Sequence, residues 1–449
     1  MMRKITLIAS AVAALAGRPA SAHGPRLAEQ LDPGKALNII NMVMVHDVIA
    51  PPVAARYYAY STLAPYSIVA ARTPSLPAPQ RLVKSFTADL RLDTVKAAYD
   101  YQIAAYYSML ETARLLLPSG EETLGEEEQS FLQIMTKQGV KPGVLNQSVR
   151  VGKLAAAAVV KFSKGDHYGQ LSALKRYTPV KAEGSWYPTP PAYLEAVEPN
   201  WKTIRPLVID SASQFRPVAP YPFSKDTASA FYHEVLAVYK ISKKLTPDQV
   251  EITQFWDCNP FAVNTSGHMS IGFKKISPGG HWMNIAALVA KQQKVGFDKT
   301  IYVLCAEGIT LMDAFISTWE AKYTSNRIRP ETYINRYLDV KWQPALQTPP
   351  FPEYTSGHAV VSSASAEVLT YLLGDKIAYI DDTEIPFGSG QRPFKSFRQA
   401  AAEASISRFY GGIHYLESCT VGNAQGQRLG RYIVVALQKA SSKSVSVAK

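Results

Sequence analysis

Apolar residues recur at intervals of three and four positions along most of this chain, which is the period of a helix with one buried face. Strand-like alternation of apolar and polar residues is scarce. Runs of small residues, such as residues 154–160, favour close contacts between neighbouring helices. The pattern therefore predicts an all-α fold of helical bundles, with helices over residues 51–71, 94–117, 126–137, 149–162, 224–243, 282–294, 299–324, 358–373, 395–410 and 421–437.

Nine prolines lie between residues 179 and 222 and interrupt any regular element there. Such a stretch is either a linker or an extended segment that wraps over the surface. We favour a wrapping segment because it carries apolar anchors that a solvated linker does not need, namely Trp186, Tyr187, Tyr193, Trp201 and Phe215. The chain is therefore predicted to have an N-terminal helical region at residues 23–178, the wrapping segment at 179–222 and a C-terminal helical region at 223–449.

The start of the chain has the form of a secretory leader. Arg3 and Lys4 precede an apolar run at residues 5–16, and Ala20-Ser21-Ala22 has the small residues of a cleavage site. We interpret residues 1–22 as a signal peptide and expect a secreted or periplasmic protein. No later stretch reads as long and apolar enough to span a bilayer, so no membrane span is expected.

The composition of the chain limits the classes of function that this protein could have. The formal net charge of +12 favours anionic substrates, but no basic run with interleaved aromatic residues indicates nucleic-acid binding. The three cysteines are too few for a disulfide scaffold, and no glycine-rich nucleotide loop is present. Several histidines show no zinc or iron spacing and are left unassigned: His46, His167, His233 and His281.

Short motifs near the C-terminus carry the candidate chemistry. In the first, Lys322 and Arg329 are about two helical turns apart, so both project from one face if the preceding helix continues this far. Pro330 would then end that helix. The second motif, residues 356–358, opens a predicted helix whose free backbone N–H groups and positive dipole end face outward. Its Gly357 lets an oxyanion approach the backbone closely.

The third motif joins Arg408 to His414. Arg408 offers a planar fork of donors suited to phosphate-like oxygens. The pair Gly411-Gly412 ends the helical turn, so that His414 can swing back toward the same point. Together the motifs supply one lysine, two arginines, a serine hydroxyl, a glycine amide and two histidines. This set predicts a pocket that grips a tetrahedral oxyanion and reacts with it.

A second Ser-Gly-His sequence at residues 266–268 shows how weak one motif is by itself. No Lys-x6-Arg-Pro sequence precedes it and no Ser-Arg-x5-His sequence follows it closely. We interpret His268 as a packed or hydrogen-bonded structural histidine. The prediction therefore depends on the order of all the motifs together.

In that order the motifs resemble the signature of the superfamily that joins vanadium-dependent haloperoxidases to type 2 phosphatidic acid phosphatases and class A bacterial acid phosphatases. Within it the chain is more similar to soluble bacterial vanadium haloperoxidases, especially iodoperoxidase-like ones. Further similar stretches lie at residues 45–52, 186–191, 256–260 and 351–354, so the resemblance covers nearly all of the mature chain. It implies helical bundles of the acid phosphatase/vanadium haloperoxidase type.

The resemblance also implies roles for the motif residues. His414 would bond vanadium through an imidazole nitrogen, and His358 would handle the protons of hydrogen peroxide. Vanadate, the implied cofactor, would be held through its oxygens by Lys322, Arg329, Ser356, Gly357 and Arg408. Lys322 would also polarise the peroxide, and a halide, iodide or bromide, would leave as hypohalous acid. The metal acts as a Lewis acid and keeps its oxidation state.

Two aromatic residues match positions that line the halide side of the pocket in relatives. Trp319 lies three residues before Lys322 and so on the same helical face. Phe351 stands where algal bromoperoxidases tend to carry a second histidine. The alternative for both residues is an ordinary place in the core.

The chain departs from the family pattern at two positions. Thr355 stands where a proline usually precedes Ser-Gly-His, and threonine can cap a helix. Ser418 stands where an aspartate is often found four residues after the last histidine. A carboxylate there would orient the imidazole and raise its basicity, and Glu417 is a neighbouring candidate for that role.

The same pocket also fits a soluble acid phosphatase. In that alternative, phosphate takes the place of vanadate, His414 attacks phosphorus to form a phosphohistidine and His358 protonates the leaving alcohol. A helical protein that only binds phosphate is the third hypothesis. Relatives are often oligomers, but no heptad pattern in this chain identifies an interface.

Overall fold

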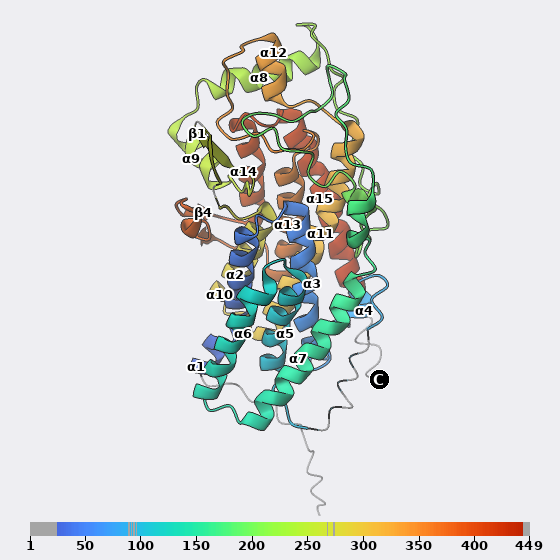
Figure 1. Ribbon diagram of the computed structural model, residues 1–449, viewed down its shortest axis with the longest axis vertical. Helices are drawn as coiled ribbons and strands as arrows, with labels where there is room; N and C mark the ends of the chain where they lie inside the picture. Colours follow the sequence, from blue (N-terminus) through green and yellow to red (C-terminus); the bar gives the residue numbers. More distant parts are fainter. Residues whose placement is uncertain are drawn as a thin grey trace, which may run out of the picture.

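The structure is a computed structural model that describes residues 25–442 except for 89, 91, 93, 94, 96, 267 and 273. The predicted signal peptide at residues 1–22 lies outside the described residues and stays a prediction. Figure 1 shows an elongated molecule built almost entirely of helices. The predicted all-α class is confirmed.

The described elements follow one another along the chain as mostly long helices with a few short ones. The α-helices are α1 (Pro25–Gln30), α2 (Pro33–His46), α3 (Pro51–Ala70), α4 (Pro79–Leu82), α5 (Tyr101–Leu116), α6 (Gly120–Lys137), α7 (Pro142–Ser163), α8 (Ala230–Ser242), α9 (Pro247–Phe255), α10 (Pro278–Gln292), α11 (Phe297–Ser325), α12 (Pro330–Tyr337), α13 (Gly357–Leu373), α14 (Phe397–Tyr410) and α15 (Leu416–Ser442). Short 3₁₀ helices are η2 (Tyr168–Ala173), η3 (Trp201–Thr203) and η4 (Ile385–Phe387). Two antiparallel hairpins pair β1 (Val263–Ser266) with β2 (Met269–Gly272) and β3 (Tyr379–Asp381) with β4 (Arg392–Phe394).

Each predicted helix corresponds to a helix of the structure, although several ends differ. The observed helix ends differ from the predicted ones because capping residues, which lie outside the apolar pattern, determine where a helix begins and ends. Asp100 accepts hydrogen bonds from the backbone N–H groups of Gln102 and Ile103 at the start of α5, and Pro142 begins α7. The sequence pattern missed α2, which has 14 residues, and the short helices α1, α4, α9 and α12, whose 4 to 9 residues are too few for a clear period.

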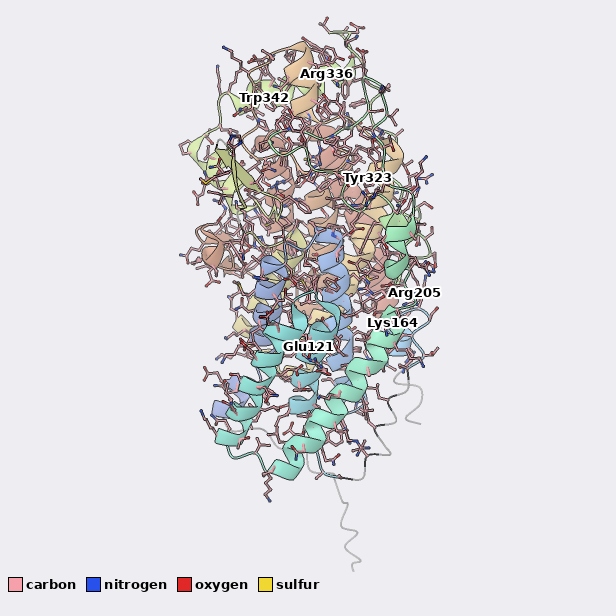
Figure 2. The ribbon with its side chains drawn as sticks, in the orientation of Figure 1. Glu121, Lys164, Arg205, Tyr323, Arg336 and Trp342 are labelled. Atoms are coloured by element: carbon pink, nitrogen blue, oxygen red, sulfur yellow. The ribbon has the colours of Figure 1, made fainter. Side chains whose placement is uncertain are left out.

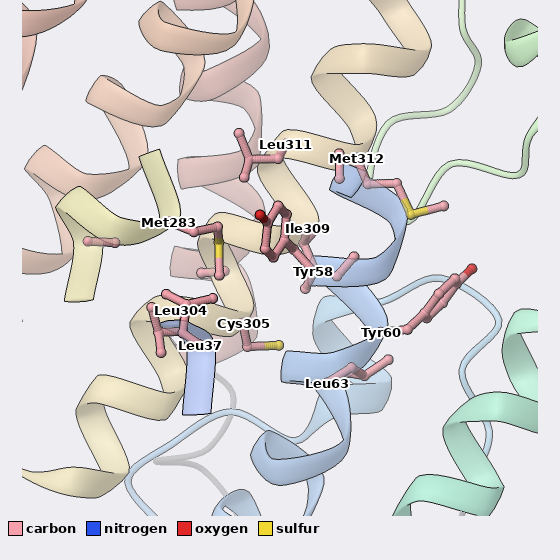
Figure 3. Close-up of a cluster of buried hydrophobic side chains, with 14 of the residues drawn as sticks. Leu37, Tyr58, Tyr60, Leu63, Met283, Leu304, Cys305, Ile309, Leu311 and Met312 are labelled. Atoms are coloured by element: carbon pink, nitrogen blue, oxygen red, sulfur yellow. The ribbon is translucent and has the colours of Figure 1, made fainter. Parts of the chain in front are cut away.

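Helix α11 is the central helix, and it packs on α3, α13 and α10. In Figure 1, α5, α6 and α7 lie in the lower half of the molecule, whereas α13, α14 and α15 lie in the upper half. Figure 3 shows part of the shared core, with Tyr58 of α3 beside Ile309 of α11. Cys305 in the same core is fully buried. One hydrophobic cluster thus contains residues from both predicted helical regions, and the boundaries of those regions stay predictions.

The apolar character of α11 corrects one expectation. Its most apolar stretch has a mean hydropathy of 1.4, so by length and composition Phe297–Ser325 is able to cross a membrane. The expectation that no such stretch exists was therefore wrong. All of that stretch is buried inside the protein, where it packs against α3 and α13.

The proline-rich residues 179–222 run along α11 and the end of α7. Trp186 and Trp201 are fully buried, whereas Tyr193 is 61% exposed and is not the anchor that we expected. Asp313 of α11 accepts three backbone hydrogen bonds of 2.8 Å from residues 207–209. Arg205 donates to backbone carbonyls at the C-terminal end of α7, where Figure 2 shows it beside Lys164. Buried carboxylate and guanidinium contacts thus fix this segment to the helices.

A buried carboxyl group at the contact of α11 with α13 predicts a pH dependence of stability. Burial raises the pKa of Glu307 from 4.5 to about 8. Between these values the folded protein keeps a proton that the unfolded chain releases, so the free energy of unfolding falls as pH rises from about 4.5 to about 8. Glu307→Gln removes this titration and keeps the shape of the side chain.

We expect the variant to match the wild type near the lower end of this range and to exceed it by a few kcal/mol at the upper end, since one pKa unit is about 1.4 kcal/mol. Urea unfolding of both proteins at several pH values measures the difference. A difference that does not change with pH would contradict the expectation.

Candidate active site

The first motif adopts a geometry that the sequence pattern did not predict. Helix α11 ends at Ser325 because Asn326 adopts a left-handed conformation, with φ of 47°. Arg329 is therefore the residue that precedes α12, and Pro330 begins this helix instead of ending the previous one. The prediction that Lys322 and Arg329 share one helical face was wrong, since a turn between two helices brings them together.

Lys322 lies in the last turn of α11 and is fully buried. Its ammonium group donates to the backbone carbonyls of Pro352, Glu353 and Thr355 at 3.1, 3.1 and 2.6 Å. These bonds occupy all the N–H donors that a lysine has. In this arrangement Lys322 therefore acts on the site through its charge.

Arg329 joins the loop before α13 to the third motif. Its Nε donates to the carbonyl of Phe351 at 3.0 Å, and its Nη1 donates to the carbonyl of Ile413 at 2.8 Å. The same Nη1 lies 3.1 Å from Nε2 of His414. The other terminal nitrogen, Nη2, is buried without a hydrogen-bond partner.

Two neighbours determine which nitrogen of His414 carries the proton. Nδ1 lies 2.8 Å from Oε1 of Glu353, and an ionised carboxylate only accepts, so Nδ1 donates. Arginine only donates, so Nε2 accepts from Arg329. Burial, followed by the charge of Arg329, lowers the pKa of His414 well below 6.5, which favours the neutral ring. Nε2 therefore carries no proton, as a metal ligand must, and its electron pair accepts from Arg329 in this arrangement.

Glu353 supplies the carboxylate that the family pattern usually places at position 418. Its second oxygen lies 3.5 Å from Arg327, which also pairs with Glu417 at 2.7 Å. Glu417 thus contacts Arg327 and not His414, and the buried hydroxyl of Ser418 has no partner. The carboxylate behind the imidazole comes from the other side of the Ser-Gly-His motif, which the sequence pattern did not reveal.

The second motif begins α13 as predicted. The hydroxyl of Ser356 caps the helix by accepting from the backbone N–H of Ala359, whereas Thr355 donates its hydroxyl to Gln425 and is not the cap. A Cβ built on Gly357 would meet only the side chain of Lys322 within 4.0 Å, so the space beside this backbone is open. Nε2 of His358 is buried without a hydrogen-bond partner.

Arg408 lies in the last turn of α14 and is 1% exposed. Its Nη1 donates to the carbonyl of Trp256 at 2.6 Å, and its Nε has no partner. The carbonyl of Trp256 thus orients the guanidinium from a distant part of the chain.

These side chains surround one small cavity. His358, Arg408, His414 and Gly357 line part of it, together with Asn259 and Cys258, and the rest of the lining is apolar: Pro51, Pro260, Phe261, Pro278, Phe315, Trp319, Pro349, Phe351 and Ile413. Among the described residues that line the cavity there is no carboxylate. Unpaired donors of Arg329 and Arg408 and the free Nε2 of His358 belong to this same group of residues. Of the predicted oxyanion-binding residues, Gly357 and Arg408 line the cavity, whereas Lys322, Arg329 and Ser356 do not. Arg329 joins the cavity through its contact with His414.

Buried cations shift each other's pKa values. Burial and then Arg329 lower the pKa of Lys322 well below 10.5, and burial lowers the pKa of Arg329 to about 10. Burial and then Arg408 lower the pKa of His358 well below 6.5. An anion among these groups would stabilise their protonated forms, so binding an oxyanion and keeping these charges favour one another.

Trp319 and Phe351 both line the cavity, as predicted, and their ring centres lie 5.0 Å apart. Trp319 donates to the carbonyl of Val197 at 3.1 Å, so the wrapping segment fixes one of these rings. Cys258 and Phe261 also line the cavity. The similar stretch at residues 256–260 contains Cys258, but no sequence argument pointed to Phe261. His268 is exposed between β1 and β2, so the packed alternative for this histidine was wrong.

Comparisons with known proteins agree with this geometry. A family model described as the VCPO second helical-bundle domain matches residues 335–443. No curated protein matches significantly. The crystal structure of the first bacterial vanadium-dependent iodoperoxidase is 41% identical, with a TM-score of 0.84 over 91% of this chain and 96% of that chain.

Two bacterial vanadium-dependent chloroperoxidase structures, at 15% identity, share the fold. The holo-type structure has a TM-score of 0.63 over 93% of this chain and 95% of that one, and the apo-type structure has 0.65 over 88% and 96%. The identity to the iodoperoxidase extends over nearly both whole chains. The chain therefore belongs to the family of bacterial vanadium-dependent haloperoxidases.

Proposed function

We propose that this protein is a vanadate-dependent haloperoxidase that oxidises iodide with hydrogen peroxide to hypoiodous acid. The observation that carries the proposal is the unprotonated Nε2 of His414, whose ring is fixed by Glu353 and Arg329 beside unpaired donors of Arg329 and Arg408. An imidazole held in this way is a metal ligand with its partner in place. The 41% identity to a bacterial iodoperoxidase supports the same reading.

The residues of the cavity fit vanadate. His414 would bind the metal, while Arg329, Arg408, the Ser356 hydroxyl and the Gly357 amide would hold the oxygens. The unpaired donors of Arg329 and Arg408 support this fit because a buried donor without an acceptor is costly. When bound, vanadate supplies a Lewis acid that activates hydrogen peroxide at an unchanged oxidation state.

His358 and Lys322 have separate tasks in this proposal. The lowered pKa of His358 keeps its ring neutral near pH 7, so its free Nε2 can take a proton from hydrogen peroxide. Lys322 stabilises negative charge on the reacting oxygens from a fixed position, because backbone carbonyls hold its ammonium group.

The apolar side of the cavity supports iodide as the substrate, with bromide second. Trp319, Phe351, Phe261 and Phe315 offer polarisable rings, and the unpaired Nδ2 of Asn259 is the one side-chain amide donor among the described residues that line the cavity. Burying an ion with few donors is costly, and the cost is smallest for the large, weakly hydrated iodide.

Halide oxidation with and without vanadate tests the proposal. The vanadate-free protein is assayed with peroxide and iodide, bromide or chloride, before and after vanadate is added. Hydrolysis of p-nitrophenyl phosphate is measured in parallel, because Glu353 supplies the carboxylate that a phosphohistidine mechanism would also need. Vanadate-dependent iodide oxidation supports the proposal, whereas ester hydrolysis without halide oxidation would establish the phosphatase alternative.

Replacing His358 separates proton transfer from vanadate binding. We expect His358→Ala to lower the turnover of peroxide by about 100-fold or more, the usual contribution of a general base. Vanadate affinity should change much less. The matched control is His268→Ala, because His268 ends the second Ser-Gly-His sequence but is exposed and outside the cavity. An equal loss of vanadate affinity and turnover in His358→Ala would contradict this division of tasks.

We further propose that the protein is exported, to the periplasm or out of the cell. The basic start, the apolar run and the Ala20-Ser21-Ala22 sequence support a leader. N-terminal sequencing of the mature protein is expected to begin at His23, and a mature chain that still begins at Met1 would contradict the proposal.

A further inference from the structure

A second group of ligand-type side chains lies behind the wall of the cavity. Cys258 follows α9, His281 lies in the first turn of α10, and Glu384 lies just after β3. Their exposures are 2%, 0% and 3%, so water does not account for their polar atoms. Cys258 also lines the cavity, which places this group directly beside the candidate active site.

The atoms of this group are spaced like ligands that share one metal ion. Sγ of Cys258 lies 3.4 Å from Nδ1 of His281, and the same Nδ1 lies 3.5 Å from Oε1 of Glu384. The three atoms all lie within 4.8 Å of one another. Tetrahedral zinc, with bonds of about 2.0–2.3 Å, separates its ligand atoms by roughly 3.3–3.6 Å.

No hydrogen bond accounts for the buried position of Oε1 of Glu384. Its Oε1 is buried and has no hydrogen-bond partner, and 3.5 Å exceeds the usual length of an N–H to oxygen hydrogen bond, about 2.7–3.2 Å. A buried carboxylate oxygen within ion-pair distance of an imidazole nitrogen, with no hydrogen-bond partner of its own, has the environment of a metal ligand.

The other side of the imidazole is arranged as zinc sites require. Nε2 of His281 lies 2.8 Å from Oδ2 of Asp381, whose other oxygen accepts from the backbone and hydroxyl of Thr383. Asp381 only accepts when ionised, so Nε2 carries a proton, and in the neutral ring Nδ1 presents its electron pair to Cys258 and Glu384. Zinc would take the place of the second proton that a charged ring carries on Nδ1. The ring also stacks on Trp256, with centres 4.6 Å apart, which fixes its plane.

We infer that Cys258, His281 and Glu384 bind a zinc ion through Sγ, Nδ1 and a carboxylate oxygen, with Asp381 orienting the imidazole. A thiolate and an imidazole favour zinc over calcium or magnesium, which prefer oxygen ligands. The dication balances the negative charges of the thiolate and of Glu384. A water molecule or the second oxygen of Glu384 completes the coordination.

The proposed zinc site fixes the segments that form the wall of the cavity in the candidate active site. It joins the segment after α9, the start of α10 and the β3–β4 connection, which are far apart in the sequence. The segment after α9 also contributes Pro260 and Phe261 to the cavity, and its Trp256 carbonyl orients Arg408. Zinc therefore acts here as a structural ion that fixes the cavity lining, independently of whether the cavity binds vanadate.

Zinc loading of the purified full-length protein tests the inference. The protein is incubated with zinc chloride, desalted and analysed for metal, and we expect about one zinc per chain. X-ray absorption at the zinc edge should show one sulfur neighbour at about 2.3 Å. Loading with Co²⁺ should produce a thiolate-to-cobalt charge-transfer band.

Variants decide between this site and adventitious binding. Cys258→Ala and Glu384→Gln should lose zinc by at least about tenfold in affinity, and Glu384→Gln keeps the side-chain shape if the alanine variant folds poorly. Cys305→Ala, at another buried cysteine, and His414→Ala, in the cavity, should retain it. A wild type that retains no zinc, zinc without a sulfur neighbour, or full zinc retention by Glu384→Gln would overturn the inference.

Discussion

His414→Ala is expected to abolish vanadate-dependent iodide oxidation, with a loss greater than about 100-fold. Replacing a group that only orients a metal ligand typically costs about 10–100-fold, so removing the ligand itself costs more. The substitution also leaves Nη1 of Arg329 without one acceptor, although the carbonyl of Ile413 still accepts from it. Steady-state iodide oxidation and vanadate titration, followed by ⁵¹V NMR, measure both effects.

The control for this variant is the fold of the vanadate-free protein. His414 is 3% exposed, so its replacement leaves a small cavity, and thermal unfolding without vanadate shows how much stability is lost. A variant that remains folded and still oxidises iodide in a vanadate-dependent way would remove His414 as the proposed ligand. Loss of ester hydrolysis alone would point to the phosphohistidine mechanism.

The second large effect is expected for Glu353→Gln. Glutamine keeps the size of the side chain, but its amide can present a donor to Nδ1 of His414 and lacks the charge that fixes the ring. Vanadate affinity should fall by about 10–100-fold, as for other residues that orient metal-bound histidines. Because Glu353 acts through His414, the loss should appear in vanadate affinity before it appears in turnover at saturating vanadate.

Ser418→Ala is the matched control for this prediction. Ser418 occupies the position where relatives often carry the orienting aspartate, but its buried hydroxyl has no partner here. Removing an unpaired buried hydroxyl should leave vanadate affinity unchanged. A loss in Ser418→Ala that equals the loss in Glu353→Gln would contradict the assignment of Glu353. The tautomer of His414, read from ¹⁵N chemical shifts without vanadate, gives a measurement that does not depend on activity.

The fold and the members of the candidate site could be predicted from the sequence because both depend on local patterns. A period of three to four residues predicts a helix, and the motif residues keep fixed spacings within short segments. The sequence pattern did not predict the parts of the site geometry that depend on the backbone conformation of a single residue. The left-handed Asn326 separates Lys322 from Arg329. Asparagine adopts this conformation more readily than most residues other than glycine, so Asn326 was a helix-end signal that the periodic pattern did not include.

The sequence pattern also did not predict contacts between segments that are far apart in the chain. Glu353 and His414 are 61 residues apart, and Cys258 and His281 are 23 apart with no recurring spacing that indicates a metal site. Such pairs meet only because the helices bring their loops together. The sequence therefore identified Arg408, His358 and His414, which line the cavity, but not the carboxylate that orients His414 or the group behind the cavity wall.

The short loop before α13 has a consequence for how this pocket can change. Its carbonyls at Phe351, Pro352, Glu353 and Thr355 receive Arg329 and Lys322, while the side chain of Glu353 reaches His414. One added or deleted residue in this loop would displace two cations and the imidazole at once. Halide preference is therefore free to evolve through the ring of Phe351, which faces the cavity, but hardly through the length of the loop.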